Sequence, residues 1–267
     1  MTETLPPVLL VGFGKMGGAM LAGWRERGVA PSIAIDPAAP SAPGPDVTVL
    51  TDAAAIPAGF APAAVVLAVK PQNAAATLPA FARFAGRAVF LSIMAGRSIA
   101  GMREVLGEQA AIVRAMPNTP AAIRQGITVA CAGPGVSAAQ RALCDSLLAA
   151  IGSVAWVEDE SLIDPVTAVS GGGPAYVFLL AELLERAAVE QGIPADLARQ
   201  LARQTVSGAG ALLAASGQDA AELRRAVTSP KGTTEQALAV LMAEAAWPAL
   251  VSRAIAAATR RSRELAG

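Results

Sequence analysis

Short apolar runs alternate with helical periodicity over the first 150 or so residues of the chain. The runs read VLLVG, IAID, VTVL, AVVLAV, AVFLSI, AIVRAM and ITVACAG, at residues 8–12, 33–36, 47–50, 64–69, 88–93, 111–116 and 127–133. Helical spacing is found at 16–27, 74–84, 99–106 and 137–150, and a last short strand is expected at 153–157. Continuous apolar strands alternating with helices predict an α/β Rossmann-type domain, with a doubly wound parallel sheet covered on both faces.

Strand patterns stop near residue 158, and the remainder of the chain has helical spacing. Helices are expected at 174–191, 194–215, 220–226, 234–246 and 248–264. Pro174 and Pro194 suit first helical turns, where the missing backbone N–H costs nothing. The pattern therefore predicts two domains, a Rossmann-like domain over residues 1–159 and an all-α domain over residues 160–267.

Composition narrows the class of protein. The chain is 54% hydrophobic and 16% charged with a formal net charge of zero, so it has material for a core and no basic field for nucleic acid or an anionic membrane. No uninterrupted apolar run reaches the ~20 residues that cross a bilayer. The start, MTETLPPVLL, has no basic residue ahead of its apolar run, so no secretory signal and a cytoplasmic protein are expected.

Histidine is absent from the sequence, and the cysteines do not replace it. This excludes Ser-His-Asp chemistry and removes the commonest general base and metal ligand. Cys131 and Cys144 fit no zinc or CxxC spacing, and a disulfide between them is not expected in a cytoplasmic protein. We therefore expect no metal, and chemistry that needs little proton transfer or is supplied by a cofactor.

A glycine motif of the GxGxxG type follows the first expected strand. Its residues are Gly12, Phe13, Gly14, Lys15, Met16 and Gly17. In this context Gly12 allows the tight turn, Gly14 lets the backbone approach a pyrophosphate, and Gly17 lets the helix pack close to the sheet. The stretch predicts a site for NADPH or NADH, with the anion at the start of a helix.

Asp36 ends the second expected strand, 24 residues after Gly12. At this position an acidic side chain binds the hydroxyls of the adenosine ribose, which favours NAD because a 2′-phosphate would be repelled. The other interpretation is that Asp36 caps the turn before Pro37. Both remain open.

Further loops follow strands at the edge of the sheet where ligands bind in such folds. The segments AVKPQ and MAG contribute the candidate cofactor-binding residues Ala68, Val69, Lys70, Pro71, Ala95 and Gly96, and MPNTP follows the next strand. Lys70 is a candidate acid or a charge near the cofactor, although its backbone is the preferred contact and its ammonium is expected in solvent. Asn118 is expected to bond its own loop.

Several motifs occur together in a fixed order along the chain. VGFGKMGGAM, AVKPQ, RAMPNTP, TAVSGGGPAYVF, QTVSGAGALL and VTSPKGTT run from the first strand to residue 234. In this order they resemble the motifs of the Δ1-pyrroline-5-carboxylate reductase family, over essentially the whole chain. The glycine motif is shared by many dehydrogenases, whereas MPNTP, SGGGPAY and TSPxGTT together are far more specific.

The resemblance implies NAD(P)H-dependent reduction of 1-pyrroline-5-carboxylate to L-proline. It implies that the helical domain binds substrate and forms a homodimer, and that dimers can assemble into rings. Carried onto VTSPKGTT, it assigns the substrate carboxylate to Ser229, Gly232 and Thr233, and the ring nitrogen to Thr234, the candidate catalytic residue. A helix start suits a carboxylate, although Thr233 with Gln236 also fits an ordinary capping box.

The chain departs from the family pattern at several positions. Gly172 stands where serine is usual, so a hydroxyl is missing there, and Lys231 stands where glycine is usual. If that position needs positive φ, Lys231 is strained. Asp36 replaces a small polar residue found in NADP-using members. These departures keep two alternatives: a reductase of a related cyclic imine or hydroxy acid, and a dinucleotide-binding regulatory protein without catalysis.

Overall fold

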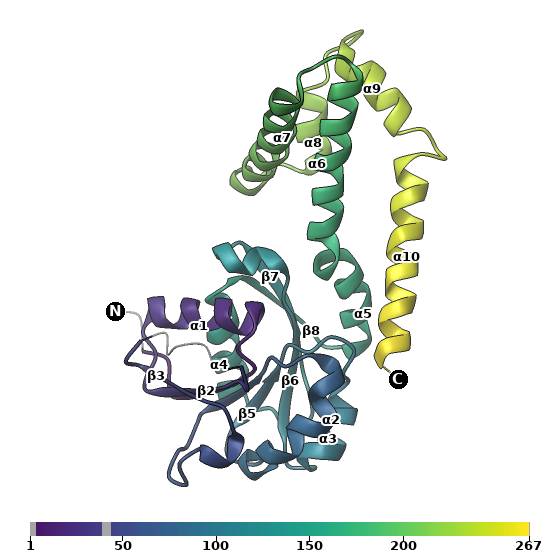
Figure 1. Cartoon of the computed structure of the whole chain (residues 1–267). Helices are drawn as coiled ribbons and strands as arrows, with labels where there is room; N and C mark the ends of the chain where they lie inside the picture. Colours follow the sequence, from purple (N-terminus) through teal and green to yellow (C-terminus); the bar gives the residue numbers. More distant parts are fainter. Residues whose placement is uncertain (1–3, 39–43, 267) are drawn as a thin grey trace. The chain divides into compact units, whose positions relative to one another are not determined.

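The computed structural model describes residues 4–38 and 44–266. The chain divides into two compact units, one of Met1–Gly171 with Ala258–Gly267 and one of Gly172–Ala257, and each is described by itself. The first unit therefore contains a segment from the C-terminal end of the chain in addition to the alternating N-terminal part (Figure 1).

An eight-stranded sheet organises the first unit (Figure 1). Its strands are β1 (Val8–Val11), β2 (Ser32–Ile35), β3 (Val47–Leu50), β4 (Ala64–Leu67), β5 (Val89–Ser92), β6 (Ala111–Met116), β7 (Gly126–Ala132) and β8 (Gly152–Val157). The order is β3-β2-β1-β4-β5-β6-β7-β8, and the first six strands in the sequence are parallel to one another. This confirms the predicted doubly wound fold.

The last two strands run in the opposite direction. β7 pairs antiparallel with β6, and β8 pairs parallel with β7. A short connection, which includes the 3-10 turn η4 (Thr119–Ile123), joins β6 to β7. A parallel neighbour needs a long crossover, so this connection can only return the chain antiparallel. The sheet is thus mostly parallel, whereas the sequence predicted a wholly parallel one.

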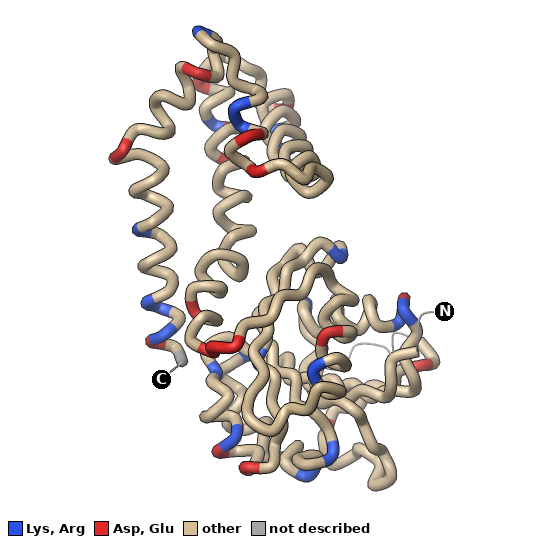
Figure 2. Tube along the Cα trace, turned by 180° about the vertical axis from the view of Figure 1, so that it is seen from behind, with Lys and Arg blue, Asp and Glu red and all other residues tan. Residues whose placement is uncertain are grey.

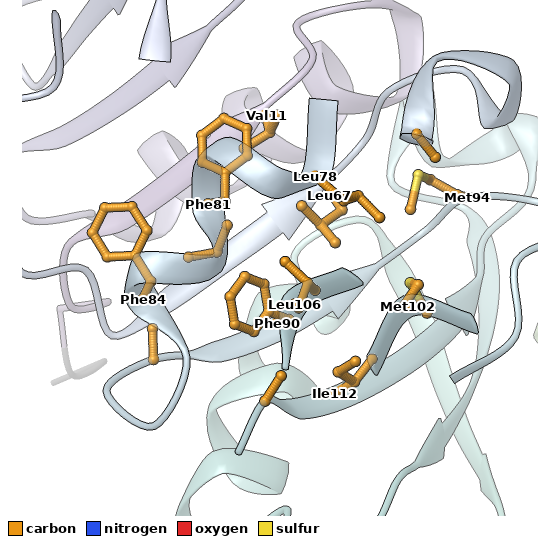
Figure 3. Packing of buried hydrophobic residues seen from close by; sticks show 14 of the residues in the cluster. Val11, Leu67, Leu78, Phe81, Phe84, Phe90, Met94, Met102, Leu106 and Ile112 are labelled. Carbon is orange, nitrogen blue, oxygen red and sulfur yellow. The ribbon is translucent and has the colours of Figure 1, made fainter. Parts of the chain in front are cut away.

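Helices cover both faces of the sheet. The helices of the first unit are α1 (Lys15–Arg27), α2 (Ala74–Thr77), α3 (Ile99–Leu106), α4 (Ala138–Ala149) and α5 (Ile163–Val166), and short turns include η2 (Pro71–Asn73), η3 (Leu78–Phe84) and η5 (Glu160–Leu162). Figure 3 shows one face, where Phe81 of η3 and Met102 of α3 pack with Phe90 of β5. On the other face, Trp24 of α1 and Leu147 of α4 join a second buried cluster.

The second unit is helical. Its helices are α6 (Gly173–Glu190), α7 (Ala195–Ala215), α8 (Ala220–Ala226), α9 (Thr233–Leu241) and the first part of α10 (Trp247–Ala266), and a π-helical turn, η6 (Thr167–Gly171), precedes α6. Within this fully described unit the buried residues are Ala198 and Ala202, whereas Phe178 and Leu212 are largely exposed. In the monomer the unit has very little core, so its apolar surface requires a further partner.

Two predicted helices differ from the structure. The stretch 74–84 is α-helical only through Thr77 and continues as the 3-10 segment η3, because Pro79 cannot donate a backbone hydrogen bond. The helix expected at 234–246 begins one residue earlier and ends at Leu241. The other predicted elements are found with shifts of a few residues at their ends.

Candidate functional site

The glycine motif forms the turn between β1 and α1, beside the first residues after β4. Gly12 has φ of 97°, and a Cβ atom there would lie 2.7 Å from the carbonyl carbon of Ala68. A Cβ at Gly17 would overlap the carbonyl oxygen of Gly12. Both positions therefore require glycine for the fold itself. In the sheet order β1 lies between β2 and β4, so this turn is at the point where the strand order reverses and ligands bind in such sheets.

Gly14 differs from the other glycines of the motif. It is the N-cap of α1 with φ of −75°, and no side chain among the described residues caps the helix there. A Cβ added to Gly14 would have no atom within 4 Å. The fold therefore does not need glycine at this position. The uncapped amides and the open space above Gly14 fit a dinucleotide pyrophosphate.

The Asp36 carboxylate accepts two hydrogen bonds, one from the glycine turn and one from the turn that follows Asp36. Its Oδ2 accepts a hydrogen bond of 2.7 Å from the Phe13 N–H, and its Oδ1 accepts one of 2.9 Å from the Ala38 N–H. The second bond confirms the turn-capping interpretation. The first places a carboxylate against the glycine turn, a contact that the sequence did not predict. The ribose interpretation stays a prediction.

The loops after β4 and β5 are tied together by Arg97, which the sequence did not single out. Its Nε and Nη2 donate hydrogen bonds of 3.2 and 2.9 Å to the Pro71 carbonyl. Lys70 is exposed, as expected. In the loop after β5, Ala95 is exposed, whereas Gly96 is buried. The candidate residues Ala68, Val69 and Pro71 are partly buried.

The loop after β6 is fixed at both ends. Asn118 Oδ1 accepts a hydrogen bond of 2.9 Å from the Ile127 N–H, which confirms the prediction that this side chain bonds its own loop. Arg124 has φ of 61° and donates to both carboxylate oxygens of Glu26 in α1, over 3.1 and 2.7 Å. The pair holds η4 against α1. The residue in the left-handed conformation is an arginine and not a glycine, so this geometry could not be predicted from the sequence.

Arg114 in β6 is a buried cation that was not among the predicted site residues. Its side chain is 3% exposed, and its Nη1 lies 2.9 Å from Glu160 Oε1. The same oxygen accepts a hydrogen bond of 2.8 Å from the Ile99 N–H at the start of α3. An arginine inside the apolar run AIVRAM was a usable signal, because a cation buried in a sheet requires an acidic partner.

The VTSPKGTT segment leads into α9 in the second unit. Gly232 is the N-cap, and no described side chain caps the helix. Thr233 is therefore the first helical residue, and the predicted capping box between Thr233 and Gln236 is wrong. The Gly232 N–H donates to the Ser229 carbonyl over 3.0 Å, which makes a tight turn ahead of the helix. Ser229, Thr233 and Thr234 are exposed.

Lys231 has a positive φ, the condition under which a lysine at this position is strained. Its φ is 59°, in the left-handed region where a side chain is strained. Its backbone N–H donates a hydrogen bond of 2.8 Å to Glu235 Oε2. Glu235, in the first turn of α9, therefore holds the turn that precedes this helix. This contact was not predicted.

The structure gathers the predicted residues into two groups. The cofactor candidates lie at the carboxyl ends of β1, β2, β4 and β5 in the first unit, and the substrate candidates lie at the start of α9 in the second. The described part of the chain contains no group of three or more His, Cys, Asp or Glu side chains able to hold a metal ion.

Comparisons with known proteins agree with this arrangement. Residues 160–265 match the family model described as pyrroline-5-carboxylate reductase dimerisation. The chain is 40% identical to the pyrroline-5-carboxylate reductase of Pseudomonas aeruginosa over 271 residues, which cover 98% of this chain and 97% of that protein. It is 36% identical to the Arabidopsis thaliana enzyme over 202 residues, covering 75% and 72% of the two chains.

Solved structures of such reductases share the fold over their whole length. The Coxiella burnetii pyrroline-5-carboxylate reductase superposes with a TM-score of 0.88 at 31% identity, covering 99% of this chain and 100% of that one. The Plasmodium falciparum pyrroline carboxylate reductase, solved with NADP bound, gives a TM-score of 0.81 at 26% identity and covers both chains completely. From the identity over nearly its full length, the chain belongs to the pyrroline-5-carboxylate reductase family.

Proposed function

We propose that the uncapped start of α1 binds the cofactor and that the uncapped start of α9 binds the substrate. As a pyrroline-5-carboxylate reductase, the chain reduces the C=N bond of 1-pyrroline-5-carboxylate to form L-proline, the last step of proline biosynthesis. The observation that carries the residue assignment is that no described side chain caps either helix and that each has a glycine, Gly14 or Gly232, at its N-cap.

The cofactor end consists of the glycine turn and the loops beside it. The α1 amides after Gly14 would face the pyrophosphate, with Phe13, Lys15 and Met16 as backbone contacts. In the loops after β4 and β5, residues 68–71 and Ala95 would line the side of the cofactor site opposite the glycine turn. The Plasmodium falciparum relative was solved with NADP bound, which supports a nicotinamide dinucleotide here. The finer choice depends on Asp36, whose carboxylate at the glycine turn would repel a 2′-phosphate, so we propose a preference for NADH.

The substrate end consists of the turn before α9. The first amides of the helix have no intrahelical acceptor, and the helix dipole adds partial positive charge there. We propose that the Thr233 amide and the Ser229 hydroxyl bind the substrate carboxylate, and that Gly232, whose own N–H donates to the Ser229 carbonyl, lets the carboxylate approach the turn closely. Each charge-assisted hydrogen bond contributes about 1.5–3 kcal/mol, so several are needed to orient so small a molecule.

The reaction requires positioning more than acid catalysis. The reduced nicotinamide supplies the hydride that the imine carbon accepts. Thr234 would hold the ring nitrogen through one hydrogen bond and so fix the face of the imine that is presented. A cyclic imine is basic enough to arrive with its proton from solvent, which agrees with a chain that lacks histidine. Thr234 is therefore assigned an orienting role.

The helical unit is proposed to form a homodimer. Its matched family model describes dimerisation, and it exposes large apolar side chains such as Tyr176, Phe178 and Leu212. The first half of α6 carries no charged residue (Figure 2). The segment Glu160–Glu190 is long and apolar enough to cross a membrane by length and composition alone. Only 6% of its most apolar 18 residues are buried within the structure. We assign this surface to a second copy of the chain, with rings of dimers as a further prediction.

The cytoplasm as location, and the boundary between residues 159 and 160, stay predictions. The boundary is supported by the start of the dimerisation model at residue 160. Limited proteolysis of the native dimer would test it, because the first cut should fall near residue 160.

One assay tests the proposed activity and its cofactor. Purified protein is mixed with 1-pyrroline-5-carboxylate and either NADH or NADPH, and loss of absorbance of the reduced nicotinamide is followed. We expect turnover with a higher kcat/KM for NADH. No oxidation with either cofactor would refute the function, and a preference for NADPH would limit Asp36 to its turn.

The variant Asp36→Ser tests the cofactor argument directly. We expect it to raise kcat/KM for NADPH relative to NADH by about tenfold or more, since removal of one repelled charge is worth on the order of 1.4 kcal/mol. Asp46→Ser, at an exposed carboxylate ahead of β3, serves as the matched control. An unchanged ratio in Asp36→Ser would contradict the assignment.

The variant Thr234→Ala tests the substrate end. We expect kcat to fall by about 10- to 100-fold while the Kd for NADH measured by fluorescence stays within a factor of about two. Thr228→Ala, which removes a hydroxyl that bonds only the Arg224 carbonyl among described residues, is the control. Equal losses of turnover and of cofactor affinity would remove Thr234 from its role.

A further inference from the structure

The C-terminal turns of α10 carry buried polar side chains. Along Trp247–Ala257 no residue is buried, whereas Thr259 and Ser262 are 9% and 8% exposed. A helix that only covered an apolar surface would bury aliphatic residues at these positions. These turns belong to the first compact unit, so the polar contacts are made with the sheet and its helices.

Ser262 donates a hydrogen bond to a buried carboxylate. Its Oγ lies 2.7 Å from Asp164 Oδ1 in α5, and Asp164 is 8% exposed. The same oxygen lies 3.8 Å from Arg114 Nη2. The Nε and Nη2 atoms of Arg114 have no hydrogen-bond partner among the described residues. The Arg114 guanidinium thus balances the charge of Asp164 without a close hydrogen bond to it. The short hydrogen bond to Asp164 comes from Ser262.

The network continues to the loop after β5. Arg114 bonds Glu160, and Glu160 accepts from the Ile99 N–H, which lies just past the loop Met94–Ser98. One guanidinium therefore connects the C-terminal turns of α10 with the start of α3.

The same turns also touch that loop directly. Gly96 has φ of 62°, and a Cβ added there would lie 3.0 Å from the Leu265 carbonyl oxygen and 3.1 Å from its Cβ. Gly96 is buried beneath this contact, while its neighbour Ala95 is exposed. The loop is consequently held from behind at Gly96 and at Ile99, and Ala95 is the part left open to a ligand.

We propose that Asp164, held between Ser262 and Arg114, is a positioning residue for the cofactor, because it fixes the C-terminal turns of α10 against the loop Met94–Ser98. The proposal rests on the proposed function in assigning that loop to the nicotinamide end of the site. Removing one partner from a buried charged network leaves the others unpaired, so the loop should loosen when Ser262 or Asp164 changes.

The variant Ser262→Ala tests this in the full-length dimer. We expect the Kd for NADH, measured by fluorescence titration without substrate, to rise by about three- to tenfold, since one hydrogen bond to a charged group is lost. We also expect faster hydrogen exchange at Ile99 and in residues 94–98, with kcat at saturating NADH nearly unchanged. Ser262→Thr, which keeps the hydroxyl, should restore both values.

Ser252→Ala, an exposed serine of the same helix, is the matched control and should change neither value. Asp164→Asn is the second variant and should raise the Kd at least as far as Ser262→Ala. A lower melting temperature with unchanged Kd and unchanged exchange at residues 94–99 would reduce the network to a structural role and overturn the proposal. Tight NADH binding without turnover in the wild-type chain would refute the proposed reaction and leave this inference intact, whereas no cofactor binding at all would overturn both.

Discussion

At the scale of single residues, the turn before α9 contains a backbone conformation that is strained for a residue with a side chain. Lys231 stands in the left-handed region at φ of 59°, and the Glu235 carboxylate holds its amide there. Left-handed backbone costs a residue with a side chain about 1–2 kcal/mol. The turn before α9 is therefore maintained by a hydrogen bond from the helix, because the lysine does not favour the conformation by itself.

Lys231→Gly should raise the free energy of unfolding by about 0.5–1 kcal/mol, because relief of strain exceeds the extra freedom of glycine in the unfolded chain. Denaturant unfolding at a fixed protein concentration measures the change. Lys231→Ala removes the same charge and keeps the strain, so it should bring no gain. Equal stabilities of the two variants would contradict the role of φ.

The buried thiols give a second prediction at this scale. Burial, with a smaller contribution from Asp145, raises the pKa of Cys144 to about 12, and burial also raises the pKa of Cys131. Neither thiol should react with an aromatic disulfide reagent at pH 8 in the folded protein, and both should react in denaturant. Rapid reaction of either one in the native protein would show that it is open to solvent.

The raised pKa of Cys144 also sets a dependence on pH. The neutral folded thiol stabilises the protein fully below the unfolded pKa near 9.0, and that contribution is lost as pH rises from about 9 toward 12. Between pH 8 and 10 the unfolding free energy of the wild type should fall relative to Cys144→Ala by about 1.4 kcal/mol. Parallel pH profiles of the two proteins would contradict this.

At the scale of elements, the start of α1 separates folding from binding. Gly17 is packed against the Gly12 carbonyl, whereas Gly14 faces open space. Gly17→Ala should lower the free energy of unfolding by about 1–3 kcal/mol through overpacking.

Gly14→Ala should leave the free energy of unfolding within about 0.5 kcal/mol of the wild type and raise the Kd for NADH at least about tenfold, since its methyl group would occupy the approach to the α1 amides. Equal effects of both variants on stability would refute the distinction.

Elements also show how far the sequence leads. Strands such as β1 and β4 were predictable, because a strand buried on both faces is a continuous apolar run. The direction of β7 was not, since apolarity carries no direction and only the short connection from β6 sets it. The glycine turn was predictable from its spacing as a tight turn between a strand and a helix, and its role as a cofactor site stays a prediction. The contact of Asp36 with Phe13 and the clamp of Glu235 on Lys231 were not, because each depends on the path of the backbone between the partners.

At the scale of the whole molecule, the proposed dimer would complete the second unit. With Ala198 and Ala202 as its buried residues and Phe178 67% exposed, this fully described unit has little core of its own. Obligate interfaces resemble a core divided between two chains, which matches this surface. Oligomer formation and the stability of the helical unit should therefore be inseparable.

Phe178→Asp should shift the dimer toward monomer, raising its dissociation constant at least about 100-fold, and should lower the melting temperature of the helical unit. Sedimentation over a range of protein concentrations measures the shift. Val105→Asp, at an exposed apolar residue of α3 in the first unit, is the control and should leave the mass unchanged. An unaltered dimer in Phe178→Asp would place the interface elsewhere.

The return of α10 to the first unit has a consequence for biosynthesis of the protein. Residues 258–266 are synthesised after the strands of the sheet and after the helices of the second unit, yet they belong to the first unit. Nascent domains generally fold as their segments appear, so the Gly96 loop and the Asp164 carboxylate stay uncovered until residues 258–266 have been synthesised. Completion of the first unit is thereby coupled to synthesis of the helical region that precedes residue 258, and a ribosome that stalls within that region leaves a chain unable to finish its first unit.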